Sequence, residues 1–405
     1  MKLVVSPGAR SDGCPTKGKD SRMGSLFSRL RHGNAGALSI LAALLLIAVL
    51  FQALNPNFLT PRNLSNLVLQ IGVVGTLGTG VVLALLLGEI DLSLGAVAGV
   101  AAAVLGVLAG RFGWLGFPAI LVALLAGAAM GCLQGAIVAL IGVPSFIATM
   151  AGLLAWQGLQ LILLGSTGEI LIRDPLVRSL ASGYLTPLQG VGAALLVFAL
   201  VSGTTWRRQV LRRRAGLDSS PLQRTLFELA IWAVGLAVAV IACNSYFGVP
   251  YILLILSAVV AVLMWFTERT VMGRHIYAIG GNAEAARRSG IPIAQVRIGV
   301  FALIGVLAGL GGVLSASRQF AVSIGTGGGT LLLDAIAAAV IGGTSLFGGR
   351  GRIYHALIGA LVIGSVANGL DLLGEPSSIK NIATGIILVI AVGIDALSRN
   401  RRHAQ

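Results

Sequence analysis

Long runs of apolar residues recur along almost the whole chain and are separated by short polar stretches. Twelve of these runs are long enough to cross a bilayer, which takes about 17 to 25 residues per helix. They begin near Gly36, Leu67, Leu92, Phe117, Phe146, Leu188, Thr225, Tyr251, Ile298, Leu331, Ile353 and Lys380. The pattern predicts an all-α fold, a polytopic transmembrane helix bundle of about twelve spans.

Two of the runs differ from the others. Those near Leu92 and Leu331 are rich in glycine and alanine and open on an acidic residue. Irregular backbone at membrane depth is tolerated where protein or a cavity surrounds it. Each of the two segments is therefore expected to be either a full span or a broken, re-entrant helix, which gives ten to twelve spans.

The amino-acid composition indicates whether water or lipid surrounds most of the chain. Of its 405 residues 56% are apolar and only 11% are charged, whereas soluble domains carry about 25% charged residues. There is too little polar surface to coat the two or three soluble domains that this length would suggest. We expect a bilayer to surround most of the chain, which excludes an ordinary soluble enzyme.

The net charge of +15 lies in short clusters between the apolar runs. No continuous basic face results, so nucleic acid is not an expected partner. If the amino terminus is cytoplasmic and every run crosses, 23 of the 29 lysines and arginines fall on the cytoplasmic side, as the positive-inside rule requires. We expect a multi-pass protein of the inner (cytoplasmic) membrane with both termini cytoplasmic.

This layout divides the chain into three parts. Residues 1–35 are predicted to be a flexible basic cytoplasmic tail held near anionic lipid. Residues 36–398 form the transmembrane domain, with a cytoplasmic insert at 206–224 and a second cytoplasmic segment at 269–297. Residues 399–405 form a short cytoplasmic tail.

The sequence contains no recognisable catalytic or metal-binding motif. The stretch nearest to a phosphate-binding GxxxxGK[ST] loop runs from Gly13 to Lys19, but Asp20 follows it. There is no HExxH, GxSxG or CxxC, and the histidines and cysteines are far apart. We expect no enzyme activity, no cofactor and no metal in this chain.

Acidic residues inside or beside apolar runs are candidates for function, because a carboxylate at the bilayer centre costs about 2.5 to 3.5 kcal/mol and usually faces the bundle interior. Glu89 and Asp91 precede one small-residue run and Asp334 opens another. Asp91 suits either a helix N-cap or contact with a substrate. Their two helices would run in opposite directions, which indicates either an inverted repeat with broken helices or chance similarity.

Residues 277–292 predict a short capped helix between two spans. Asn282 is suited to the N-cap, Ala283 to Arg288 are helix formers with the acid first, and Gly290 and Pro292 stop the helix. Such a helix is either a connector or a docking element for a cytoplasmic protein.

Four stretches carry a family resemblance: residues 88–95, 143–152, 277–291 and 333–346. Together they resemble the membrane permease subunit of bacterial ABC sugar importers of the ribose/xylose/arabinose class, over about residues 36–398. Within that class the similarity is greatest to D-xylose permeases, because Glu89 precedes Ile90 to Ser93 and because of the basic insert at 206–222. Phe347 and Arg350 depart from the family by making their loop bulkier and more basic.

The resemblance implies a homodimer that receives D-xylose from a periplasmic sugar-binding protein. A separate ATP-binding cassette subunit on the cytoplasmic face would use ATP to power transport. The resemblance places the following residues at the contact with that ATPase: Gly280, Gly281, Asn282, Glu284, Arg287, Arg288 and Gly290. It places Glu89, Asp91, Ser93 and Asp334 near the translocation path or its gates.

Polar side chains within the apolar runs could supply such a path with hydrogen bonds and an aromatic face for a neutral sugar. They are Gln70, Gln134, Trp156, Gln157, Gln160, Asn368 and Asn381, of which Trp156, Gln157 and Asn368 are our candidates for the path or a gate. Each could equally be an interhelical hydrogen-bond partner.

Two other transporter classes remain open. An ion-coupled secondary transporter should carry ionisable residues placed within the membrane for the coupling ion. An ABC permease for another pentose or for branched-chain amino acids is the second alternative. An amino-acid substrate would need groups that recognise an ammonium and a carboxylate, which the sparse intramembrane charge does not favour.

Overall fold

The computed structural model describes residues 35–216 and 222–403. The predicted basic tail therefore lies almost entirely outside the described residues. Residues 44–405 form one unit, and the contacts given below are contacts within it.

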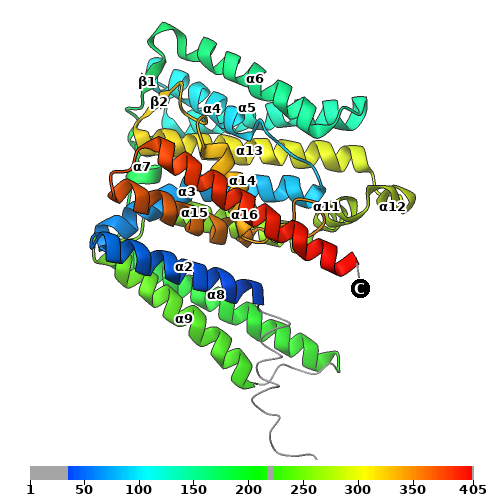
Figure 1. The fold of residues 1–405 in the computed structure, drawn as a ribbon. Coiled ribbons are helices and arrows are strands. Elements are labelled where there is room, and N and C mark those ends of the chain that lie inside the picture. The colour runs from blue at the N-terminus through cyan, green and yellow to red at the C-terminus, as the bar shows by residue number, and fades with distance from the viewer. Residues whose placement is uncertain (1–34, 217–221, 404–405) are drawn as a thin grey trace, which may run out of the picture. The chain divides into compact units, whose positions relative to one another are not determined.

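Helices make up most of the described chain (Figure 1). The first half contains α2 (Ala35–Leu54), α3 (Pro61–Leu87), α4 (Leu94–Leu105), α5 (Gly116–Ala136), α6 (Ser145–Leu164), α7 (Pro175–Ser182) and α8 (Pro187–Arg214). The second half contains α9 (Leu222–Asn244), α10 (Tyr251–Arg269), α11 (Val271–Gly281), α12 (Ala283–Arg288), α13 (Ile293–Gln319), α14 (Leu331–Ile341), α15 (Tyr354–Leu372) and α16 (Ser377–His403). Short π-helical or 3₁₀ turns extend three of them: η1 (Gly106–Arg111), η2 (Ile137–Ile141) and η3 (Gly165–Thr167).

Every one of the twelve apolar runs coincides with a helix. Within the described residues, nine helical stretches are long and apolar enough to cross a membrane: 61–87, 94–111, 116–141, 145–167, 187–214, 225–244, 251–269, 293–319 and 354–372. The other three runs fall on shorter apolar stretches at 42–54, 331–341 and 377–390. The predicted all-α polytopic bundle is confirmed.

Helix α3 shows how local sequence sets the ends of a span. Thr60 stands at the N-cap, with its side chain accepting from the Asn63 backbone N–H, and Pro61 follows at a position where no N–H is needed. Gly88 ends the helix at φ +81°, a left-handed conformation that favours glycine. These signals confine α3 to residues 61–87.

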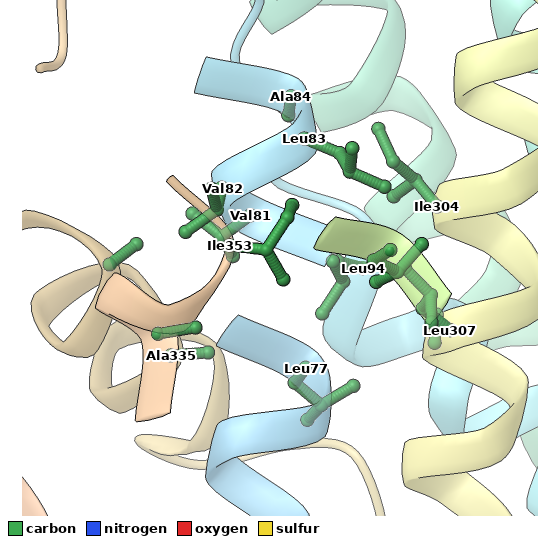
Figure 2. Packing of buried hydrophobic residues seen from close by; sticks show 14 of the residues in the cluster. Leu77, Val81, Val82, Leu83, Ala84, Leu94, Ile304, Leu307, Ala335 and Ile353 are labelled. Atoms are coloured by element: carbon green, nitrogen blue, oxygen red, sulfur yellow. The ribbon is translucent and has the colours of Figure 1, made fainter. Parts of the chain in front are cut away.

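Helix α3 is also the centre of the bundle. It packs against α13 on one side and against α14 and α15 on the other. Figure 2 shows Ile304 and Leu307 of α13 near the Leu83 and Leu94 side chains, and Ala335 of α14 with Ile353 across α3 from them. In the most apolar 18-residue stretch of α3, 78% of the residues are buried, whereas only 6% are buried in the corresponding stretches of α8 and α9. Helices α8 and α9 therefore carry the exposed apolar surface expected of lipid-facing helices.

The contacts of α4 and α14 mirror each other. Helix α4 packs against α5, α6 and α13, whereas α14 packs against α15, α16 and α3. Exchanging α3–α6 with α13–α16 converts one set into the other, as an inverted repeat requires. Helix α14 has 11 residues, about 16 Å, and is too short for a hydrocarbon core of about 30 Å. The structure supports the repeat with broken helices, in which α14 covers only part of the membrane thickness.

Some elements differ from the expected outline. Two three-residue strands, β1 (Glu169–Leu171) and β2 (Ala321–Ser323), pair antiparallel with Ile170 opposite Val322, and strands this short leave no alternation to detect in the sequence. Helix α8 continues to Arg214 and α9 begins at Leu222, so most of the predicted insert is helical, and residues 217–221 lie outside the described chain. Helix α16 reaches His403 and includes most of the predicted carboxy-terminal tail.

Candidate functional site

Residues Gly88 to Ser93 form an irregular break between α3 and α4, and the first turn of α6 holds this break. The Ser145 hydroxyl accepts from the Ile90 N–H at 3.3 Å, and the Thr149 hydroxyl accepts from the Leu92 N–H at 3.1 Å. Backbone groups beyond a helix end need such partners wherever packing excludes water. The break is therefore a built feature of the fold.

Asp91 stabilises the start of α4. Its Oδ1 accepts from the Ser93 N–H at 2.8 Å and from the Ser93 hydroxyl at 2.7 Å, and both residues are buried. Ser93 occupies the N-cap position itself, so Asp91 acts two residues earlier than a simple N-cap. Of the two roles expected for Asp91, this geometry supports stabilisation of the helix start. Contact of Asp91 with a substrate stays a prediction.

A polar chain continues from Ser93 to α5 and α6. Gln134 of α5 lies 3.0 Å from the Ser93 hydroxyl, while its Nε2 and the Trp156 indole N–H of α6 are buried without partners. Both nitrogens lie within 3.2 Å of the position that a Cβ on Gly152 would take. The Ser93 hydroxyl donates to the Gln134 Oε1, so the polar chain joins the Asp91 break to α5. Its far end, beside Gly152 of α6, holds two buried donors.

An ion pair ties the same break to α13. Arg297 Nη2 lies 2.8 Å from Glu89 Oε1, with the two side chains 27% and 10% exposed. Removing one member of a largely buried pair costs about 3 to 5 kcal/mol, because the other charge stays without compensation. The sequence indicated Glu89 as a candidate and counted Arg297 only as part of a basic cluster.

The second break, between β2 and α14, is held by the other end of α6. The Gln160 amide donates to the backbone oxygens of Ser323 at 3.1 Å and Thr326 at 2.9 Å. Gln160 follows Thr149 by 11 residues in α6, which is about 16 Å along the helix axis. One helix therefore holds both breaks at different depths.

The two broken segments cross backbone to backbone. A Cβ on Gly99 of α4 would lie 2.6 Å from the Thr326 oxygen and 2.4 Å from Gln160 Oε1. On the other side, Gly327 has φ +79°, and a Cβ there would lie 2.2 Å from the Gly95 oxygen. Only glycine fits at this crossing.

The capped helix expected after Asn282 is present as α12. The Asn282 side chain accepts from the Ala285 N–H at 3.0 Å, and Gly290 adopts φ +78° beyond the helix end. The predicted contact residues Gly281, Asn282, Glu284, Arg287, Arg288 and Gly290 are all exposed, while Gly280 is half-buried. An exposed ion pair joins Arg288 Nε to Glu284 Oε1 at 3.1 Å, so α12 presents an ordered charged surface.

Helix α11 connects this surface to the membrane helices. A Cβ on Gly280 would lie 1.9 Å from the Leu86 oxygen of α3 and 2.7 Å from the Gly349 nitrogen. The Gly349 N–H itself donates to the Leu86 oxygen at 3.1 Å. The Tyr277 hydroxyl donates to the Gly351 oxygen at 2.9 Å, and burial raises the pKa of Tyr277, so this donor stays protonated. Helix α11 thus contacts the end of α3 and the loop between α14 and α15.

The path residues expected from the sequence fall in different places. Asp91 and Ser93 lie in one polar chain with Gln134, and Glu89 lies in the same break. The Trp156 indole N–H is buried without a partner near the Gln134 end of that chain. Gln157 is exposed on the neighbouring position of α6. Asp334 accepts from Thr330 at 3.0 Å within the first turn of α14, and Asn368 pairs with Asn63 at 2.7 and 3.0 Å.

Comparison with known proteins gives a consistent set of relatives. The family described as "Branched-chain amino acid transport system / permease component" matches residues 63–392. The chain is 36% identical to the xylose transport system permease protein XylH of Escherichia coli K12, over 93% of this chain and 95% of that protein. It is 36% identical to XylH of Haemophilus influenzae, over 92% of this chain and 99% of the relative. It is 32% identical to the ribose import permease protein RbsC of Escherichia coli K12, over 88% and 92%. No solved structure matches the chain.

Proposed function

The chain belongs to the permease family of branched-chain amino acid transport systems, and we propose that it is the subunit through which an ABC importer moves D-xylose across the inner membrane. The observation that carries the proposal is the 36% identity to two xylose permeases over more than nine-tenths of both chains. The ribose permease matches at 32% over a smaller share. These relatives are transport subunits, and we therefore assign the chain to transport and not to catalysis.

The proposed assembly contains two copies of this chain in lipid, an ATP-binding cassette subunit and a periplasmic sugar-binding protein. Both termini are cytoplasmic in this proposal. The charge pattern assigns the break at Glu89, the segment at Gly280 and the loop at Gly349 to the same side of the membrane. The structure supports this orientation, because the three segments are in contact through Leu86, Gly349 and Arg297.

In the proposed mechanism, α12 is the surface that the ATPase engages. ATP is hydrolysed in that partner, and its movement displaces α11. Gly280 transmits the displacement to the end of α3 and to the loop between α14 and α15. The glycine crossing between the two broken segments then acts as a gate, whose open and closed populations the partners shift.

Uptake in reconstituted vesicles tests this proposal. Radiolabelled xylose should enter vesicles only when the chain, its ATPase, its binding protein and ATP are all present, with ribose and leucine as comparators. Slow ribose and leucine uptake would support D-xylose as the substrate. Uptake by this chain alone under an ion gradient would replace the proposal with an ion-coupled transporter.

Reversing the two charges of α12 should uncouple ATP hydrolysis from transport. Glu284→Lys with Arg288→Glu keeps an i,i+4 ion pair, so the helix loses only about 0.5 kcal/mol, while the surface offered to the ATPase changes sign at both positions. We expect xylose uptake to fall by about 5- to 150-fold, the usual range of a lost coupling, with normal amounts of protein in the membrane.

The control for this variant is Arg212→Glu, a charge reversal on an exposed residue near the end of α8. It should leave uptake and ATP hydrolysis unchanged. Normal uptake by the double variant would remove α12 from the coupling mechanism.

A further inference from the structure

A cavity of about 660 Å³ lies beside the amino-terminal turns of α3. Its lining includes Arg62, Asn63, Asn66, Tyr184 and Tyr246. Helix α3 has 27 residues, about 40 Å of length, and its other end contacts Gly280 of α11. The cavity is therefore at the opposite end of the bundle from the surface proposed for the ATPase.

Hydrogen-bonding groups of the lining fall into two sets. Asn63 is committed to the protein, because it pairs with Asn368 and donates to the Phe58 oxygen at 2.9 Å. Arg62 and Asn66 make no side-chain hydrogen bond or ion pair to any described residue, and both are exposed. They stand at i and i+4 on α3 and so share one face of that helix. Two adjacent polar groups are thus free to bind a solute.

Aromatic rings supply another wall of the cavity. Tyr184 precedes α8 and Tyr246 follows α9, and the Phe247 ring lies 5.6 Å from the first and 4.3 Å from the second. Two backbone bonds, Leu185 N–H to the Val249 oxygen at 2.9 Å and Tyr251 N–H to the Gly183 oxygen at 3.0 Å, hold the two loops together. Helices α8 and α9 therefore position both tyrosines.

The chemistry of the lining selects a class of ligand. Amide, guanidinium and phenol groups together donate and accept hydrogen bonds, as adjacent hydroxyls on a ring require, and tyrosine rings present an apolar face beside a polar tip. Among the residues that the structure describes, no carboxylate lines the cavity, so an ammonium group would lack a counter-charge from them. The volume lies in the range of about 300 to 1,000 Å³ found for small-molecule sites.

We propose that this cavity is a binding site for a neutral monosaccharide, the first that the sugar meets on the outer side of this subunit. The identity of the sugar, and the side of the membrane, rest on the proposed function. Residues Arg62 and Asn66 bind the hydroxyls, and Tyr184 and Tyr246 cover the ring.

Saturation-transfer NMR on the purified chain in lipid nanodiscs, without its ATPase and binding protein, tests the site. D-Xylose should show transfer signals that excess leucine does not remove. We expect Asn66→Leu and Tyr246→Ala each to weaken binding by about fivefold or more, as expected for a lost polar or ring contact. Trp206→Ala, which changes an exposed aromatic residue of α8 outside the cavity, should leave the signals unchanged.

The site is overturned if the unaltered chain gives no xylose signals. It is also overturned if both cavity variants give the same signals as the unaltered chain. Arg62→Leu replaces either variant that fails to insert. Uptake by the complete importer without binding by the isolated chain would reject the cavity and keep the proposed function, whereas binding without uptake would do the reverse. Loss of binding-protein association in the variants, with no xylose signal, would assign the surface to protein docking and reject the sugar site.

Discussion

Gly280→Ala is expected to abolish xylose uptake, while Gly281→Ala is expected to leave it near normal. The added Cβ at position 280 would lie 1.9 Å from the Leu86 oxygen and 2.7 Å from the Gly349 nitrogen, both backbone atoms. Helix α11 must therefore move away from α3 and from the loop between α14 and α15. Overpacking of this kind costs about 1 to 3 kcal/mol, and the displaced helix loses the contact through which α12 acts on the membrane helices.

Gly281 supplies a closely matched control for packing within the chain, because it is the next residue of the same helix and a Cβ there meets nothing within 4 Å. It lies on the surface proposed for the ATPase, but a single methyl group there removes no charge and no hydrogen bond from that surface. Uptake, ATP hydrolysis and the amount of protein in the membrane should be measured together for both variants. We expect Gly280→Ala to hydrolyse ATP without transport. Equal, normal uptake by the two variants would show that α11 does not transmit the movement of the ATPase.

Gly99→Ala is expected to produce the second large loss, by forcing apart the crossing of the two broken segments. Its Cβ would lie 2.4 Å from Gln160 Oε1 and 2.6 Å from the Thr326 oxygen. Accommodating it moves the loop before α14 and weakens the Gln160 bonds to Ser323 and Thr326. We expect a lower melting temperature, since overpacking costs about 1 to 3 kcal/mol, together with loss of coupled uptake.

The control for Gly99→Ala is Gly158→Ala in α6, where a Cβ meets nothing within 4 Å. Alanine at that site should retain uptake and stabilise the helix by up to about 1 kcal/mol. Thermal unfolding in nanodiscs and uptake in vesicles are the two measurements. If Gly99→Ala matched Gly158→Ala in both, the crossing would have room to spare and could not be a gate.

Local signals in the sequence predicted much of the architecture. The apolar runs coincide with helices because a chain in lipid must satisfy its backbone within each segment. The capped helix at 283–288 has the predicted bounds, since Asn282 and Gly290 act within a few residues of themselves. The breaks before α4 and α14 were also indicated locally, by glycines and acids in otherwise apolar runs.

Relations between distant residues could not be predicted in the same way. Glu89 gave a reason to expect a buried partner but no means of choosing Arg297, and Asn63 lies 305 positions from its partner Asn368. Gln160 was one of seven polar residues in apolar runs, and only the structure shows that it holds the second break. Pairings of this kind depend on how helices pack, which periodicity along one helix does not report.

The sequence by itself therefore determined that most of the chain lies in a bilayer and where its helices and breaks lie, because these depend on composition or on residues close together. Its motifs indicated the transporter family by resemblance. The tertiary structure decided which glycines matter. Gly280 and Gly281 are adjacent and chemically identical, yet a Cβ on the first would overlap the backbone of α3, while a Cβ on the second would meet open space. That difference arises from segments almost 200 positions apart in the chain, which only packing brings into contact.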